Sequence, residues 1–571
     1  MPLQPWWKEI PGRLEWEFAW LAHEGLRNEE TGRDDASGTL ELRVEYPTDG
    51  KVLNHHVIFP PFFPDARYEV RCAEVKLVHH QNPFTNELCL LGRSSALWDP
   101  AVPLATFLKK QMPDLLKAGM TDDRSEAKAI EDHQAEPATP FLSFLEDSVL
   151  LIDESAEPGD GSAGEFDAIV NMTGSGEHPA IKGIIRSLDE RQLWIPGSAI
   201  VGSYGWNVEM RGQWYNTSAF PPGLNAAQFL TWVHEEHPDV AKPRFEIERK
   251  HYSYELLAFQ IPSEVGHRQI GMERLGVIRI TPRFGNKKTR AASCANLRVE
   301  PLGRDLLYRR APELSPLAKK CVGVIELGCI GAPAAVEFAR AGVGELRILD
   351  MHTVDSGTIV RWPIGLPAIG FQKINALEKY ISENFPLTKV VIEGGRVGGI
   401  IANGGTNIGA MSRFLKDVDL VLDAAAELGV SSILSHLASD LKIPVVSIVS
   451  TNGGWGGTVV TYEPGKSGCY DCFLRYLNEG SITSPPASPL EKVQPAGCAE
   501  PTYLASNFDT GQVSLAGVRT AVSVLCSEVE GGYPAMPKGI AVLSLRDASG
   551  HAIYPTWQTY DLTAHPECKY H

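Results

Sequence analysis

The sequence predicts a multidomain protein that combines α+β and α/β architecture. It has 571 residues, and single hydrophobic cores stop growing beyond roughly 300 residues, so two to four domains are expected. From Cys321 onward a strand, a glycine turn, a helix and a second strand follow one another, which is typical of a parallel βαβ unit. Short strand-like runs upstream of that unit, such as Leu275–Ile280, indicate a β-rich segment.

We therefore expect three parts along the chain. They are an N-terminal domain of residues 1–150, a β-rich linking or docking module of residues 160–310, and a C-terminal domain of residues 312–571. Polar, acidic stretches at residues 122–137 and 154–165 indicate linkers between them. The middle module contains no chemical motif.

The composition narrows the classes of function. The formal net charge is -17, from 70 acidic and 53 basic residues. Neutralising phosphates requires clustered Lys and Arg, so no nucleic-acid partner is expected. The chain has no signal-like start and no run of about 18 apolar residues, which predicts a cytoplasmic protein without a membrane partner. Ten scattered cysteines do not make a disulfide framework, and thiols, metal ligands or nucleophiles are the better interpretations.

One cysteine of the N-terminal domain has a distinctive setting. Cys89 follows His80-Gln81-Asn82-Pro-Phe-Thr-Asn-Glu-Leu, with Ile58-Phe-Pro-Pro-Phe-Phe-Pro64 before this run and Trp98-Asp-Pro after it. A lone cysteine before an apolar pair is more often a core residue. These landmarks, however, resemble in order those of a ubiquitin-conjugating enzyme. The resemblance implies a thioester on Cys89 and oxyanion stabilisation by Asn82, although the family's His-Pro-Asn appears here as His80-Gln81-Asn82.

The C-terminal domain predicts a doubly wound sheet with a nucleotide site. A glycine turn that opens a helix offers N–H groups to a phosphate, but the turn Glu326-Leu-Gly328-Cys-Ile-Gly331 has a carboxylate in place of its first glycine. Asp350 ends the second strand, where an acid can bind ribose hydroxyls. A dehydrogenase would explain Asp350, but it would have no particular use for Arg361 and Lys373. Arg361 and Lys373 favour an adenylating enzyme, because two cations stabilise the charge that develops as pyrophosphate leaves.

This region resembles the ubiquitin-activating family, including bacterial activators of molybdopterin and thiamine synthesis. The resemblance implies ATP and Mg²⁺ as cofactors. The landmarks are Ala341-Gly-Val-Gly-Glu-Leu-Arg-Ile-Leu-Asp350, Thr353 to Arg361, Gln372-Lys373, Asp417 to Asp423 and Gly468-Cys-Tyr-Asp-Cys472, and the implied nucleotide ligands are Gly328, Gly331, Asp350, Arg361, Lys373 and Asp423. Ala426 falls where the family has an acid for magnesium, so that duty is assigned to Asp423 or Glu427.

Two further cysteine features follow. Cys498 lies after the Pro- and Ser-rich run Ser484–Pro489, where the family has the cysteine that takes the acyl group, a structural role being the alternative. A tetrahedral zinc site needs four N or S ligands. The predicted set is Cys469, Cys472, Cys568 and His571.

The whole chain resembles the fused activating and conjugating proteins of bacterial CBASS antiphage operons. The resemblance implies adenylation of a protein C-terminus, a first thioester on Cys498, a second on Cys89, and transfer to a target amine such as lysine. It also implies a homodimer and, as the activated partner, a cyclic-nucleotide-producing nucleotidyltransferase. Three alternatives stay open. They are the same relay acting on a ubiquitin-like protein, a sulfur-carrier activator, and a scaffold with a dead nucleotide site, for which Glu326 and Ala426 speak.

Overall fold

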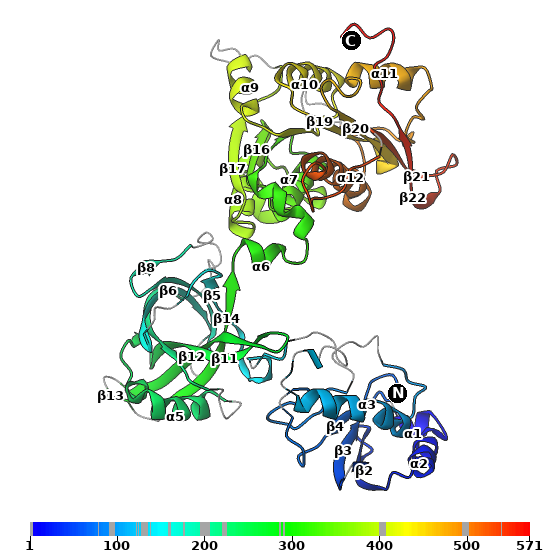
Figure 1. Ribbon diagram of the computed structural model, residues 1–571. Coiled ribbons are helices and arrows are strands. Elements are labelled where there is room, and N and C mark those ends of the chain that lie inside the picture. The colour runs from blue at the N-terminus through cyan, green and yellow to red at the C-terminus, as the bar shows by residue number, and fades with distance from the viewer. Residues whose placement is uncertain are drawn as a thin grey trace. The chain divides into compact units, whose positions relative to one another are not determined.

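In the computed structural model, the described residues are 4–48, 50–77, 79–90, 98–121, 123, 125–126, 135–137, 139–157, 161–174, 178–194, 206–219, 225–284, 287–288, 292–398, 407–493, 502–537 and 539–570. They form two compact units: residues 1–152, 156–193 and 204–300 in the first, and residues 153–155, 194–203 and 301–571 in the second. Figure 1 labels the helices and strands. Within the described ranges, no helix combines the length and the apolar character needed to cross a membrane.

The N-terminal part of the first unit is a four-stranded antiparallel sheet with helices. Side chains alternate along β2, so that Leu40, Leu42 and Val44 are buried. The buried carboxylate of Glu17 accepts a hydrogen bond from the Leu104 amide at 2.8 Å, which ties α2 to the start of α3. The elements are α1 (Trp6–Glu9), α2 (Arg13–His23), β1 (Asn28–Asp34), β2 (Thr39–Thr48), β3 (Lys51–Phe59), β4 (Glu69–Arg71) and α3 (Leu104–Met120).

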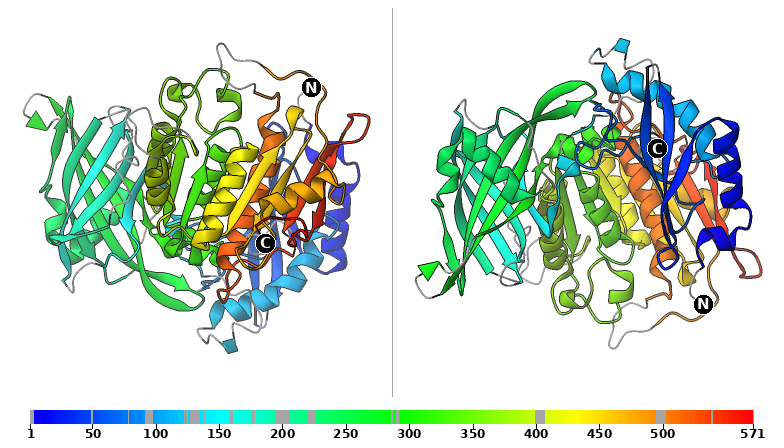
Figure 2. Two further views of the ribbon diagram at one scale, coloured as in Figure 1. Left: turned by 90° about the horizontal axis from the view of Figure 1, so that it is seen from above. Right: turned by 90° about the horizontal axis from the view of Figure 1, so that it is seen from below.

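The middle part of the first unit is a sheet that closes on itself, which confirms the predicted β-rich module (Figures 1 and 2). Its strand order is β10-β11-β9-β6-β7-β5-β14-β12-β13, and a long pairing of β11 with β12 closes the ring. Residues 163–165, expected to be linker, instead begin β6 and pair with β9. The elements are β5 (Phe144–Asp153), β6 (Ala163–Thr173), β7 (Ala180–Leu188), β8 (Arg191–Gln192), β9 (Trp206–Asn216), α5 (Ala226–Glu236), β10 (Ile247–Arg249), β11 (Tyr252–Gly266), β12 (Gln269–Phe284), β13 (Lys287–Lys288) and β14 (Ser293–Leu302).

The second unit contains the predicted doubly wound, Rossmann-like sheet. Its eight strands run in the order β17-β16-β15-β18-β19-β20-β21-β22, parallel from β17 to β19 and antiparallel beyond. The elements are α6 (Arg304–Tyr308), β15 (Cys321–Ile325), α7 (Gly331–Arg340), β16 (Glu345–Asp350), α8 (Lys373–Asn384), β17 (Lys389–Gly394), α9 (Asn407–Leu415), β18 (Leu420–Asp423), α10 (Leu428–Leu441), β19 (Val445–Ser450), β20 (Gly456–Tyr462), α11 (Tyr470–Asn478), α12 (Asn507–Cys526), β21 (Ile540–Arg546) and β22 (Ala552–Tyr560).

The central strand β15 fixes where the site forms. Every residue of Cys321–Ile325 is buried, and the strand pairs with β16 on one side and β18 on the other. The carboxyl ends of the three strands therefore lie at one edge of the sheet, where ligands of such folds bind. Asp350 and Asp423 are the last residues of β16 and β18.

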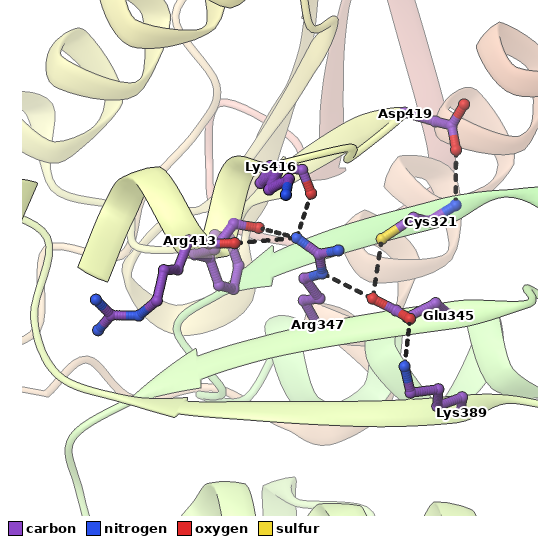
Figure 3. Close-up of polar contacts among 8 residues, drawn as sticks. Cys321, Glu345, Arg347, Lys389, Arg413, Lys416 and Asp419 are labelled. Atoms are coloured by element: carbon purple, nitrogen blue, oxygen red, sulfur yellow. Dashed lines mark hydrogen bonds and ion pairs between the residues drawn. The ribbon is translucent and has the colours of Figure 1, made fainter. Parts of the chain in front are cut away.

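Polar contacts hold the strands together near their amino ends (Figure 3). Glu345 accepts hydrogen bonds from Arg347 and Lys389, both at 2.8 Å. The guanidinium of Arg347 also donates to main-chain carbonyls at the end of α9. These belong to Arg413 and Phe414, at 3.1 and 2.9 Å, and to Lys416. These contacts fix β16 against β17 and α9. They therefore also help to hold the carboxyl ends of these strands, where the site lies.

Candidate active sites

The turn between β15 and α7 has the shape that a phosphate-binding turn needs. A Cβ on Gly331 would lie 1.9 Å from the carbonyl oxygen of Glu326, so only glycine fits there. A Cβ on Gly328 would meet no heavy atom within 4 Å, so this side of the turn is open to a ligand. Glu326 itself has a left-handed φ of 68°, a conformation that favours glycine.

Asp350 is the polar centre of this site. Its buried carboxylate accepts hydrogen bonds from the amides of Leu327 and His352, at 2.7 and 2.6 Å. The ammonium group of Lys373 lies 3.6 Å away, so the structure brings together two of the predicted nucleotide ligands. Burial alone would raise the pKa of Asp350, but the hydrogen bonds from His352 and the charge of Lys373 hold it below its usual value. The carboxylate is therefore ionised and couples the glycine turn to the start of α8.

Glu326 behaves differently from Asp350. Burial, and then repulsion from Asp350, raise the pKa of Glu326 to about 7. The Nδ1 atom of His352 lies 3.8 Å from its carboxylate. Near neutral pH a large fraction of Glu326 is thus protonated and carries no charge that would repel a phosphate. Its position in the turn is compatible with nucleotide binding.

Asp423 is as deeply buried as Asp350. Its carboxylate is fully buried and accepts hydrogen bonds from the hydroxyls of Ser431 and Ser447, at 2.5 and 2.9 Å. Burial raises its pKa. Glu427, the other acid predicted for magnesium, is partly exposed and forms an ion pair with Arg396 at 3.0 Å. Of the two acids, only Glu427 presents a carboxylate at the surface.

Cys498 lies outside the described residues, but the chain on both sides of it is described. Val493 and Thr502 pair through two main-chain hydrogen bonds of 2.7 and 2.8 Å. Next to this pair, the hydroxyl of Tyr503 lies 3.6 Å from the Cys329 thiol in the glycine turn, and Arg361 donates to the Tyr503 carbonyl at 2.9 Å. The segment that carries Cys498 therefore begins and ends beside the nucleotide turn.

Asn452 holds both arms of this segment and was missed by the sequence analysis. Its Nδ2 atom donates to the carbonyls of Ser488 and Leu490, at 3.1 and 2.7 Å, and its Oδ1 atom accepts from the Leu504 amide at 3.2 Å. The glycine pair after it, Gly453 and Gly454, adopts positive φ. That pair, shortly after the largely buried strand β19, is the signal that could have indicated a special turn.

Three predicted zinc ligands converge. The sulfur of Cys469 lies 3.6 Å from those of Cys472 and Cys568, and all three cysteines are buried. Zinc bound to thiolates at about 2.3 Å in a tetrahedron separates its sulfurs by about 3.8 Å, whereas a disulfide bond is about 2.05 Å long. The observed spacing fits a metal. His571, the predicted fourth ligand, lies outside the described residues.

Cys89 opens into a cavity of about 470 Å³ that Asn82 also lines. The Cys89 amide donates to the His80 carbonyl at 2.8 Å, which pairs the two predicted motifs directly. The Oδ1 atom of Asn82 caps the following turn by accepting from the amides of Phe84 and Thr85, at 2.9 and 3.1 Å. Among the described residues, the Nδ2 group of Asn82 has no hydrogen-bond partner and can donate to an oxyanion.

Gln81 supports this turn in place of the family's proline. Its Nε2 atom donates to the carbonyls of Cys72 and Val75, at 2.7 and 3.0 Å, and its Oε1 atom accepts from the Leu77 amide at 2.9 Å. Gln81 is itself buried. The departure from His-Pro-Asn therefore replaces a rigid ring with a hydrogen-bonded side chain.

Two regions of the chain match known families. Residues 304–528 match the ThiF family, and residues 18–145 match the prokaryotic E2 family B. Two uncharacterized proteins of Sinorhizobium fredii are each 27% identical, over 99% and 93% of this chain and 97% and 92% of theirs. The molybdopterin-synthase adenylyltransferase of Escherichia coli is 26% identical over 28% of this chain and 61% of its own. A crystal structure of E. coli MccB with ATP aligns with 47% of this chain and 74% of its own, at 12% identity and a TM-score of 0.35.

Proposed function

This chain joins a ThiF-family domain to a prokaryotic E2-like domain, as fused activating and conjugating proteins do, and we propose that the two domains form one acyl-transfer relay. ATP-dependent adenylation and ubiquitin-like conjugation are the chemistries of these domains, so the protein is a ligase-transferase.

In the first step, a C-terminal carboxylate of a protein attacks the α-phosphate of ATP and pyrophosphate leaves. Arg361 and Lys373 would neutralise the charge that develops, and Asp350 holds Lys373 in place at 3.6 Å. Gly328 and Gly331 would let the phosphates approach the turn, and Asp423 would support the strand end behind it. The observation that carries the proposal is the placement of Tyr503, because it anchors the Cys498 segment to both Cys329 and Arg361.

In the second step, the Cys498 thiol attacks the adenylate and AMP leaves. The Cys89 thiol then attacks the Cys498 thioester and takes over the acyl group. The acyl group stays in a thioester throughout, so it remains reactive toward an amine. Finally a target amine attacks the Cys89 thioester, and the amide group of Asn82 would stabilise the oxyanion that forms. The cavity that Cys89 and Asn82 share supports this assignment.

We propose that the activated protein is a cyclic-nucleotide-producing nucleotidyltransferase, with a ubiquitin-like protein as the alternative that uses the same chemistry. A homodimer of the activating domain is part of the proposal. Large apolar side chains near Arg361 and at the start of α12 support it, because they are exposed in the single chain and a second copy would cover them. They are Val360, Leu366, Phe371 and Phe508.

Two metals belong to the proposal. Magnesium would accompany the triphosphate, and Glu427 would help to hold it, since the partly exposed pair of Glu427 with Arg396 is worth only about 0–1 kcal/mol and can be replaced. Zinc would be held by Cys469, Cys472, Cys568 and His571. It would be structural and would link the start of α11 to the C-terminal segment.

Intact-mass analysis of the Cys89→Ser and Cys498→Ser proteins, each expressed with candidate partner proteins, tests the relay. A serine ester survives where a thioester is lost. We expect a protein adduct on Ser in the Cys89→Ser variant that disappears when Cys498 is also replaced. Folded variants that carry no adduct, together with no ATP–pyrophosphate exchange, would show a scaffold instead. A thiocarboxylate product would show a sulfur-carrier activator.

A further inference from the structure

Described residues between α3 and β5 form one wall of the cavity that contains Cys89. The wall consists of Ala135, Glu136, Pro137, Pro140 and Phe141. Glu136 thus places a carboxylate on the same cavity as the reactive thiol. None of the motifs that identify the conjugating domain includes this residue.

Contacts with the neighbouring histidines fix the Glu136 side chain. Its carboxylate accepts a hydrogen bond from the His80 amide at 2.8 Å and lies 3.0 Å from the Nδ1 atom of His80. Burial alone would raise the pKa of Glu136, but the hydrogen bonds and charge of His80, followed by the charge of His79, hold it below its usual value. Glu136 is therefore a carboxylate at neutral pH, with its side chain 23% exposed toward the cavity.

Residues of the closed sheet of the middle module form hydrogen bonds with this wall. The Thr139 amide and hydroxyl donate to Glu273 of β12, at 3.0 and 2.9 Å. The Glu136 amide donates to Glu264 of β11 at 3.3 Å, and the same carboxylate lies 3.1 Å from the Nδ1 atom of His79.

The turn between β11 and β12 also forms hydrogen bonds with the end of α3. The guanidinium of Arg268 donates to the carbonyls of Ala118 and Thr121, both at 2.7 Å. The hairpin of β11 and β12 therefore contacts the conjugating-like part on both sides of the wall segment.

We propose that Glu136 is a specificity-determining residue of the Cys89 site, that it selects a cationic acceptor such as a lysine side chain, and that the middle module is the part that positions it. The inference deepens the proposed function and rests on it for the acceptor reaction. Among the residues that the structure describes, the charged side chains that line the cavity are Arg67, Glu69, Glu87 and Glu136, so carboxylates outnumber the guanidinium there. Trp98 and Phe141 add aromatic surface that suits the methylene stem of a lysine.

The acceptor reaction balances without any further reagent. The ammonium group binds beside Glu136 and loses a proton to water before it attacks. The nitrogen then forms a bond to the thioester carbon, the bond from carbon to the Cys89 sulfur breaks, and the leaving thiolate takes up the second proton of the amine. Glu136 concentrates and orients the acceptor. It takes no part in the covalent change.

Charge-selective labelling of Cys89 tests the cavity independently of any conjugation. The full-length protein is treated with a cationic (trimethylammonium) and an anionic (sulfonate) methanethiosulfonate, and the Cys89 peptide is quantified by mass spectrometry. We expect Cys89 to react faster with the cation, and Glu136→Gln to lower the cation-to-anion rate ratio by about threefold or more. Glu273→Gln should lower it in the same direction, because it releases the wall.

Two matched variants separate charge from folding. Glu136→Asp keeps the charge and should retain most of the preference. Glu146→Gln removes an exposed carboxylate on β5 outside the cavity and should leave the ratio unchanged. An unchanged ratio in Glu136→Gln would overturn the proposal.

Discharge of the Cys89 thioester gives the second readout. With L-lysine as acceptor, Glu136→Gln should raise KM by about tenfold, roughly the loss of one charge-assisted contact. Discharge onto hydroxylamine, which is neutral at pH 7, should not change. An equal fall for both nucleophiles would show a structural role and refute selection. If the wild-type protein forms no thioester, the proposed function fails, while the labelling experiment still decides the role of Glu136.

Discussion

Replacing Glu326 with glutamine separates its charge from its shape. In the unfolded chain its pKa is 4.5, and in the folded protein burial and the charge of Asp350 raise the pKa to about 7. The folded state therefore binds this proton more tightly than the unfolded state. The contribution of this proton to the free energy of unfolding is fully present below pH 4.5, and it is lost as the pH rises through 7.

The size of the effect follows from the two values. The difference between 4.5 and about 7, at about 1.4 kcal/mol per pKa unit, corresponds to about 3 kcal/mol. Glu326→Gln should therefore stabilise the second unit by about 3 kcal/mol at pH 8.5 and by much less at pH 5. The same ionisation should weaken ATP binding by wild type above pH 7, since it adds a negative charge to the phosphate turn, and the variant should lack this loss.

Hydrogen exchange of peptides from residues 321–340, compared between wild type and variant at each pH in mild urea, measures the stability difference. Intrinsic exchange rates cancel in such a comparison. Glu337→Gln on α7 is the control, because among the described residues the Glu337 carboxylate pairs with Arg340, whose side chain is largely exposed. If Glu326→Gln protects the segment equally at pH 5 and pH 8.5, burial and the charge of Asp350 do not raise the pKa of Glu326 as described.

Three more outcomes are expected. Burial lowers the pKa of His55 to about 4, from 6.5 in the unfolded chain, so the first unit should lose up to about 3 kcal/mol as the pH falls from 6.5 to 4. His55→Phe should remove that part of the dependence in urea titrations followed by tryptophan fluorescence. Gln81→Leu leaves two carbonyls and one amide unpaired and should cost about 2–4 kcal/mol in the same titration. Asn452→Ala should keep ATP–pyrophosphate exchange but slow thioester formation on Cys498 by about tenfold, as seen in single-turnover assays, and equal losses in both would contradict its positioning role.

Much of the second unit could be predicted because local patterns determine it. The apolar run Cys321–Ile325, the turn glycines and the acid at Asp350 follow from strand burial, close backbone approach and sheet topology. Cys469, Cys472 and Cys568 could be grouped because metal sites have characteristic residue types and spacing. In each case the residues that determine the structure are neighbours in the sequence or belong to a short motif.

The remainder depends on contacts between residues far apart in sequence. The pairing of β11 with β12 closes the middle sheet, yet the ring also needs β9, β6, β7, β5 and β14 in an order that no local pattern indicates. The raised pKa of Glu326 could be predicted only by knowing that the carboxyl is buried and that Asp350 lies beside it. The role of Glu136 likewise depends on Glu264 and Glu273, more than 120 residues away.

Near each of the two cysteines of the proposed relay, a carboxamide side chain forms hydrogen bonds with the backbone. Gln81 beside Cys89 and Asn452 beside the Cys498 segment each donate two hydrogen bonds to carbonyls and accept one from an amide. Only a carboxamide side chain can do this without charge, because Lys and Arg only donate and an ionised carboxylate only accepts. A charge at either place would alter the reactivity of a nearby thiol or acyl group. A neutral side chain that donates and accepts thus fixes the backbone of a thioester loop while leaving the electrostatics to residues such as Arg361, Lys373 and Glu136.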